Sequence, residues 1–158
     1  MTTTLAVDLA NILCDDLMDN GFGPFYGTPC GILAPLYDVL EKRAGLITVS
    51  REDNAVGMAA GASLAGRYPA VVMQNSGFGQ SVNALASLVV PYRLPMLLVI
   101  SLRGVHPDST QENQVMGRLT EPLLRGLGIE SVTPSDLPIG RRRPVALLVP
   151  PSAFGWSA

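Results

Sequence analysis

The chain has 158 residues, of which 47% are apolar and 15% are charged. That length supports one substantial hydrophobic core and is short for two ordinary domains, so we expect a single domain over residues 1–158. The formal net charge of -2 lacks the basic excess that proteins use to bind a phosphate backbone. A nucleic acid is therefore not an expected partner.

Lysine, histidine and cysteine are scarce, which narrows the possible chemistry. Lys42 is the only lysine and falls in a helical pattern, so Schiff-base catalysis is not expected. His106 is the only histidine, and Cys14 and Cys30 are the only cysteines, which are too few for a conventional histidine-rich or cysteine-rich metal site. We expect no metal ligands in this chain, and two reduced thiols rather than a disulfide.

The distribution of apolar residues favours a cytoplasmic protein that has a partner. The N-terminus lacks the positive region of a signal peptide. The longest apolar stretch, residues 85–100, is interrupted by two prolines and an arginine, so it cannot cross a membrane as one helix. With so few charged residues, more apolar surface remains than one small core can bury, which predicts self-association or a second subunit.

The first half of the chain alternates helical and strand patterns. Leucine and isoleucine recur at helical spacing over 5–20, and a second amphipathic helix over 32–44 ends at Gly45. A short strand and turn are expected between them, within 22–31. A buried strand follows over 46–49. The next helix, over 54–66, consists mostly of small residues, so we expect its backbone to pack closely against a neighbour.

The second half continues the same alternation. We expect strands over 70–74, 96–101, 129–132 and 144–149, with helices reaching to about residue 88 and over 117–126. A glycine-rich turn is expected at 75–80, and segment 134–143 leaves room for scarcely one helical turn. Continuous apolar strands that alternate with helices indicate a parallel sheet covered on both faces. The predicted fold class is α/β, a doubly wound, mostly parallel six-stranded sheet.

Polar and small residues gather where four of the predicted strands end, and sites in such sheets lie at these carboxyl ends. The segments are GTPCG (27–31), SREDN (50–54), QNSGFG (74–79) and SLRGVHPD (101–108). Each also has a purely structural explanation. Glu52 can be a helix cap, Cys30 a small buried residue, and Arg103 with His106 a solvated polar pair. NSGFG fits neither the Rossmann glycine spacing nor a P-loop, and the arginines at 141–143 resemble a solvated charge run.

Three runs together resemble a known family. REDNAVGMAAG, VVMQNSGFGQSVNALASL and RLPMLLVISLRG are similar to the pyrimidine-binding domain of thiamine diphosphate-dependent 2-oxoacid decarboxylases, in particular to sulfopyruvate and phosphonopyruvate decarboxylases. The Gly-x-Pro element GTPCG belongs to the same likeness, which covers residues 26–117 and continues faintly over 144–150. The resemblance implies the thiamine diphosphate-binding fold.

The resemblance also implies roles for single residues. Glu52 matches the glutamate that hydrogen-bonds the cofactor's aminopyrimidine ring and so helps remove the thiazolium C2 proton. The implied cofactor-binding residues are Glu52, Gln74, Asn75, Ser76, Gly77 and, more weakly, Asn83. The implied substrate is a 2-oxoacid with a second strong anion, for which Arg103 is the better candidate donor and His106 and Arg51 are weaker ones. The implied substrate-binding residues are Pro29, Cys30, Asn75, Arg103 and His106.

One family motif is missing from this sequence. Relatives hold the diphosphate and Mg²⁺ in a second domain marked by Gly-Asp-Gly, and no such motif occurs here. The resemblance therefore implies an alpha subunit that works with a beta subunit carrying that domain. Cys30, together with Asn113 and Gln114 where phosphonopyruvate enzymes commonly carry a histidine, favours sulfopyruvate, decarboxylated to sulfoacetaldehyde. Phosphonopyruvate, decarboxylated to phosphonoacetaldehyde, is the alternative substrate, and a non-catalytic flavodoxin-like binding module is the alternative of a different class.

Overall fold

The computed structural model describes residues 2–137 and 142–156. Its centre is a sheet of six parallel strands in the order β2-β1-β3-β4-β6-β5. This arrangement confirms the predicted α/β fold class, with every strand parallel. The strands are β1 (Phe25–Gly27), β2 (Ile47–Thr48), β3 (Ala70–Gln74), β4 (Leu97–Ser101), β5 (Glu130–Val132) and β6 (Val145–Val149).

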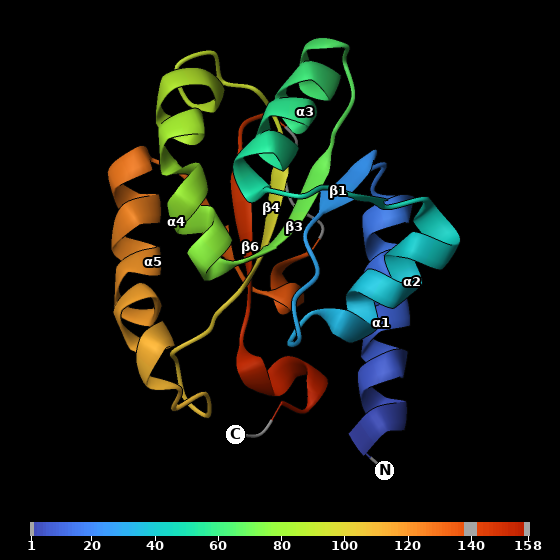
Figure 1. Cartoon of the computed structure of the whole chain (residues 1–158). Coiled ribbons are helices and arrows are strands. Elements are labelled where there is room, and N and C mark those ends of the chain that lie inside the picture. The colour runs from blue at the N-terminus through green and yellow to red at the C-terminus, as the bar shows by residue number, and fades with distance from the viewer. Residues whose placement is uncertain (1, 138–141, 157–158) are drawn as a thin grey trace.

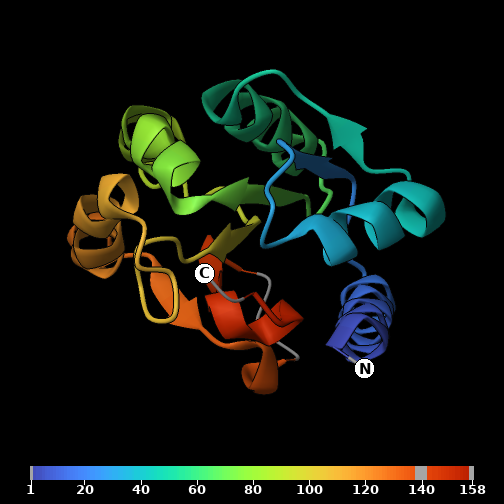
Figure 2. The same ribbon diagram turned by 60° about the horizontal axis from the view of Figure 1, so that its bottom comes forward.

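Helices cover both faces of this sheet (Figures 1 and 2). One face carries α1 (Thr2–Asp19) and α2 (Ala34–Ala44). The other carries α3 (Glu52–Leu64), α4 (Asn75–Ala84) with its π-helical continuation η1 (Leu85–Val89), and α5 (Gln114–Leu127). Short 3₁₀ turns complete the described chain: η2 (Gln111–Asn113), η3 (Pro134–Asp136) and η4 (Pro151–Phe154).

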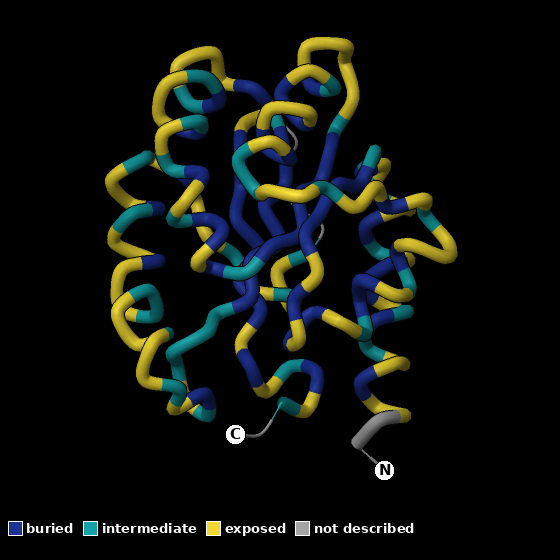
Figure 3. The backbone as a smooth tube through the Cα atoms, viewed as in Figure 1, coloured by how far each residue is buried: buried dark blue, intermediate teal, exposed yellow. Residues whose placement is uncertain are grey.

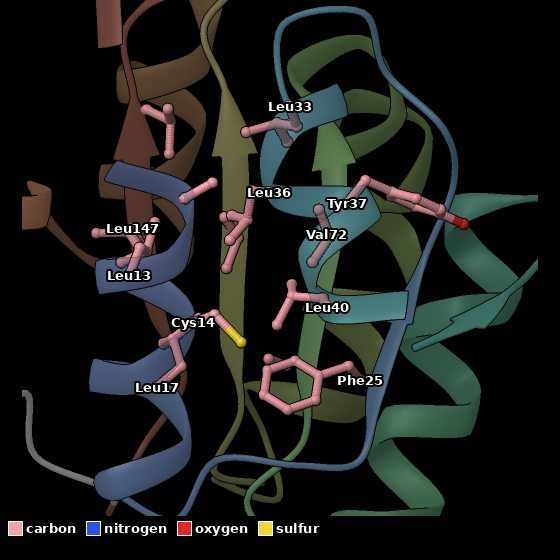
Figure 4. Packing of buried hydrophobic residues seen from close by; sticks show 14 of the residues in the cluster. Leu13, Cys14, Leu17, Phe25, Leu33, Leu36, Tyr37, Leu40, Val72 and Leu147 are labelled. Atoms are coloured by element: carbon pink, nitrogen blue, oxygen red, sulfur yellow. The ribbon is translucent and has the colours of Figure 1, made fainter. Parts of the chain in front are cut away.

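The hydrophobic core lies in two layers, because successive side chains of a strand point to opposite faces of the sheet. Val72 and Leu147 pack with α1 and α2, whereas Val71 and Leu98 pack with α3, α4 and α5. The strands β3, β4 and β6 are buried except for the half-buried Gln74 at the end of β3, and they lie between helices whose outer sides are exposed (Figure 3). Figure 4 shows the first layer, in which residues of α1 and α2 meet Phe25, Val72 and Leu147.

Most predicted elements are confirmed, and two glycine features explain how they end. Gly45 adopts a φ of 65° and its N–H donates to the carbonyl oxygen of Leu40, so it ends α2 where the sequence places the stop. Gly27 ends β1 against β3, where a Cβ would lie 2.8 Å from the carbonyl oxygen of Val72. Only glycine permits this close approach of the two strands.

Two predictions about these elements are wrong. The predicted buried strand over 46–49 is a two-residue edge strand whose residues are exposed, because β2 pairs only with β1. The predicted glycine-rich turn at 75–80 is helical: α4 begins at Asn75 directly after β3. Similarly, α3 begins at Glu52, two residues before the predicted start.

The shortened segment before β6 is only partly described. Pro134–Asp136 form a single 3₁₀ turn with a capping box between Thr133 and Asp136. In the predicted arginine run, Arg143 pairs with Glu130 at 2.5 Å, whereas Arg141 lies outside the described residues. Within residues 2–137 and 142–156, no helix is long and apolar enough to span a membrane.

Candidate active site

The register of the sheet brings the four predicted segments to one edge. Gly27 pairs with Val72, and Gln74 pairs with Ser101, so the residues that follow β1, β3 and β4 leave the sheet side by side. β6 ends at the same level, because Val149 pairs with Ser101. The chain after β6 therefore stays at this carboxyl edge, where Figure 1 shows the C-terminal segment.

Glu52 stands at this edge as the first residue of α3, where the free N–H groups and dipole of a helix favour a carboxylate. Thr28, which follows β1 and is 8% exposed, donates a hydrogen bond from Oγ1 to Oε1 of Glu52 at 2.9 Å. Gly77, in the first turn of α4, leaves the space that the Glu52 carboxyl group fills, since a Cβ there would overlap with it. Three elements thus fix one carboxylate.

A second polar cluster surrounds Cys30. Its Sγ lies 3.1 Å from Oγ of Ser101, at the end of β4, and 3.8 Å from Oε1 of Gln74. Gln74 donates from Nε2 to Oγ of the exposed Ser76 at 2.9 Å. The predicted residues Cys30, Gln74 and Ser76 are therefore connected to one another, and Ser101 joins them.

Asn75 is fully buried and links two loops. Its Nδ2 donates to the backbone oxygen of Arg103 at 2.9 Å and to Oγ1 of Thr120 at 3.2 Å, and its Oδ1 accepts from the N–H of Arg103 at 3.3 Å. Both the nitrogen and the oxygen of this side-chain amide therefore form hydrogen bonds within the chain. Its direct contact with cofactor or substrate remains a prediction, and in the structure it positions the start of the loop after β4.

The guanidinium of Arg103 is held by Asp108, whose side chain is completely buried. Nε of Arg103 donates to Oδ2 of Asp108 at 2.6 Å, and the same carboxylate accepts from Thr110, Asn113 and the N–H of Gly104. Burial alone would raise the pKa of Asp108. The hydrogen bonds from Thr110, Gly104 and Arg103 outweigh burial and hold the pKa far below its usual range.

The remaining predicted residues lie around these clusters. Pro29 and Cys30 line a pocket of about 300 Å³ with Tyr37. His106 is exposed and lines another pocket, of about 290 Å³, with Arg118. Asn83 is exposed near the end of α4, where its backbone oxygen accepts from Ser87.

Sequence reasoning missed Thr28, Ser101, Asp108 and Trp156. Thr28 and Glu52 follow neighbouring strands, so topology combined with polarity could have paired them. No sequence pattern points to Trp156, because only the folded C-terminal segment places its ring beside Arg103.

These residues match one half of a thiamine diphosphate site. A fixed carboxylate packed against a glycine suits a heterocycle whose ring nitrogen shares a proton with that carboxylate. Among the described residues, no three histidine, cysteine, aspartate or glutamate side chains are placed to hold a metal ion. The Glu52 carboxylate, its Thr28 donor and the space at Gly77 have the chemistry that the pyrimidine half of the cofactor needs.

The fold and the site together define the class as an α/β domain with a fixed carboxylate at the carboxyl edge of its sheet. The chain belongs to the thiamine pyrophosphate enzyme family: the family's N-terminal TPP binding domain matches residues 7–119. Among its relatives, the sulfopyruvate decarboxylase subunit alpha of Methanococcus maripaludis is 34% identical over 155 residues, which cover 89% of this chain and 92% of the relative.

Two further relatives carry the same likeness. The sulfopyruvate decarboxylase subunit alpha of Methanocaldococcus jannaschii is 40% identical over 110 residues, 68% of this chain and 65% of the relative. The phosphonopyruvate decarboxylase of Streptomyces viridochromogenes is 38% identical over 102 residues, which cover 62% of this chain and only 25% of that longer protein.

Proposed function

We propose that the chain is the alpha subunit of a two-subunit, thiamine diphosphate-dependent 2-oxoacid decarboxylase that converts sulfopyruvate to sulfoacetaldehyde and CO₂. The observation that carries this proposal is the Glu52 carboxylate, fixed by Thr28 and packed against Gly77 at the carboxyl edge of the sheet. The relatives named as alpha subunits of sulfopyruvate decarboxylase support the substrate and the two-subunit organisation.

Thiamine diphosphate, when bound, supplies a carbanion at the thiazolium C2 and an electron sink for decarboxylation. Glu52 holds a proton at the pyrimidine ring nitrogen, and Thr28 keeps the carboxyl oxygen in place for that transfer. Gly77 leaves the space in which the Glu52 carboxyl group lies, and Gln74 and Ser76, which are hydrogen-bonded to each other, would help to hold the same ring.

A beta subunit completes the site in this proposal. The beta subunit would hold the diphosphate through Mg²⁺. This assignment is supported by the lack of a Gly-Asp-Gly motif in the present sequence. Association of several alpha subunits and a cytoplasmic location belong to the same proposal. They are supported by the low charged fraction and by the two unpaired cysteines, Cys14 and Cys30.

The substrate occupies the space beside Cys30 and Arg103 in this proposal. A sulfonate needs a fixed cationic donor, and Arg103 is held in one geometry by Asp108. Arg118 borders a neighbouring pocket together with His106 and adds positive charge near that edge. Phosphonopyruvate is the alternative substrate, because a relative named for that activity matches 62% of this chain.

Co-expression of the chain with the product of an adjacent reading frame that encodes a Gly-Asp-Gly motif tests the proposal. CO₂ release is measured with sulfopyruvate, phosphonopyruvate and pyruvate, with and without thiamine diphosphate and Mg²⁺. We expect cofactor-dependent release with the highest kcat/KM for sulfopyruvate, and none from the chain alone. Robust turnover by the chain alone, or an inactive complex with all three acids, would contradict the proposal.

A further inference from the structure

Trp156 lies between two loops of the candidate active site. Its ring centroid is 4.8 Å from Cζ of Arg103, in the loop after β4. A Cβ on Gly31, in the loop after β1, would lie 3.7 Å from Cζ3 of the same ring. Gly31 follows Cys30, so one aromatic ring spans the distance between the Cys30 loop and the Arg103 guanidinium.

The fold after β6 fixes the position of this ring. Phe154 at the end of η4 is buried in the core layer below α1 and α2. Gly155 adopts a φ of 72°, and the backbone N–H of Trp156 donates to the oxygen of Pro151 at 3.2 Å. This turn closes η4 and directs the chain back over the carboxyl edge.

Arg103 is thereby held on two sides by groups of different charge. Asp108 takes its Nε through a buried ion pair, in which the Arg103 side chain is 16% exposed. The indole face attracts the guanidinium through its quadrupole and carries no net charge. A second carboxylate in that place would hold Arg103 as firmly but would repel a doubly anionic substrate.

We propose that Trp156 is a positioning residue that sets specificity for a 2-oxoacid with a second strong anion. The indole and Asp108 hold the Arg103 guanidinium so that its Nη groups meet the sulfonate or phosphonate. This inference rests on the proposed function and adds to it the residue that preorganises the anion contact.

The test compares two variants in the complex with the beta subunit. Trp156→Leu removes the aromatic face, whereas Trp156→Phe keeps an aromatic face and serves as the matched control. For Trp156→Leu we expect KM for sulfopyruvate to rise about tenfold while kcat changes less than about twofold. The KM or competitive inhibition constant of pyruvate, which lacks the second anion, should stay unchanged.

Each alternative result has a distinct meaning. An equal loss for both acids, an unchanged KM in Trp156→Leu, or a Phe variant as impaired as the Leu variant would overturn the role of Trp156. Failure of the wild-type complex to decarboxylate any 2-oxoacid would instead overturn the proposed function.

A second readout does not depend on activity. Trp156 is the only tryptophan of the chain, so its fluorescence reports the contact with Arg103 directly. We expect the emission of the full chain to change in Arg103→Ala and to stay as in the wild type in Arg118→Ala, an exposed arginine elsewhere on this edge. Identical emission in Arg103→Ala and wild type would contradict the proposed contact.

Discussion

Glu52 and Gly77 belong to different helices, yet the side chain of one fills the space that a side chain on the other would need. Such a fit explains why a glycine stands inside α4, where it costs roughly 1 kcal/mol of helix stability relative to alanine. The same carboxylate accepts a hydrogen bond from Thr28, which lies in a third part of the fold. The geometry of the candidate cofactor carboxylate is therefore set by two small residues, and both can be tested by single substitutions.

Thr28→Val should weaken catalysis without unfolding the chain. Valine keeps the branched shape at the end of β1 but removes the hydroxyl that donates to Glu52. A hydrogen bond to a charged group contributes about 1.5–3 kcal/mol, so we expect kcat of the complex to fall by at least about tenfold. Steady-state kinetics check this expectation. Thr28→Ser keeps the hydroxyl and should retain most of the activity, and a serine variant as slow as the valine variant would argue against the hydrogen bond.

Gly77→Ala should destabilise the folded chain, in contrast to the usual effect of this substitution in a helix. The new Cβ overlaps with the Glu52 carboxyl group, and forced displacement in a packed site costs about 1–3 kcal/mol. Gly126→Ala in α5 is the control, because nothing lies within 4 Å of a Cβ there and a gain of about 0.5–1 kcal/mol is expected. Urea unfolding of both variants measures the difference. Equal stabilisation by both substitutions would be incompatible with the packing of Glu52 on Gly77.

At the scale of elements, the loop between β4 and α5 is organised by one buried carboxylate. Asp108 accepts hydrogen bonds from Arg103, Gly104, Thr110 and Asn113, which span the whole connection. The N-terminal end of α5 also packs on this loop, where a Cβ on Gly117 would overlap with the backbone of Gly104. Loss of the charge on Asp108 should therefore affect an entire segment of the site.

Asp108→Asn tests this organisation through its pH dependence. Removing one partner of a buried ion pair typically costs about 3–5 kcal/mol, so we expect a loss of that order in the free energy of unfolding at pH 7. The pKa of Asp108 is lowered in the folded chain, so its contribution is present above the ordinary value of 3.8 and is lost as the pH falls below it. The stability gap between wild type and variant should narrow below about pH 4. A constant gap from pH 7 to pH 3 would contradict this account.

The sequence predicts the elements of this fold better than it predicts their contacts. Apolar runs and glycine stops locate β3 and the end of α2, because strand periodicity and left-handed glycine are local properties. Burial of the strand over 46–49 was predicted wrongly, since only the sheet order shows that β2 is an edge. NSGFGQ was predicted to be a turn because glycine-rich runs usually break helices, but the close packing of Glu52 gives Gly77 a place inside α4.

In the candidate site, too, the sequence predicts single residues better than the contacts between them. The resemblance places Glu52, Gln74 and Cys30 in one site, and the structure brings each of them to the same edge. The partners Thr28, Ser101 and Trp156 are determined by contacts between residues far apart in the chain. These contacts become visible only once the strands are aligned in register.

At the scale of the whole molecule, the chain exposes apolar side chains on both helical layers. Leu5 on α1 is 69% exposed and Leu64 on α3 is 71% exposed. These exposed apolar side chains support the prediction of a partner subunit, which we made from the low charged fraction. They lie outside the core that holds the sheet together, so the fold does not depend on covering them.

The proposed division of the cofactor site between two subunits makes a prediction about binding. Since the described residues provide no metal-binding cluster, we expect the chain alone to bind thiamine diphosphate at least about tenfold more weakly than the complex with its beta subunit. Isothermal titration calorimetry with Mg²⁺ present measures both affinities. Equal affinities would mean that the chain holds the diphosphate itself.

The central claim is that the Glu52 carboxyl group activates the cofactor, and C2 proton exchange of bound thiamine diphosphate tests it most directly. Glu52→Gln keeps the size of the side chain and an oxygen to accept from Thr28, so a purely structural role in the first turn of α3 would survive with a cost of about 1 kcal/mol or less. A glutamine cannot share a proton with the ring nitrogen, and loss of such assistance costs about 10² to 10⁴ in rate. In the complex with its beta subunit, we predict that this variant slows exchange and kcat at least about 100-fold with melting temperature and assembly almost unchanged. Exchange at the wild-type rate would contradict the account and leave Glu52 with a purely structural role in the first turn of α3.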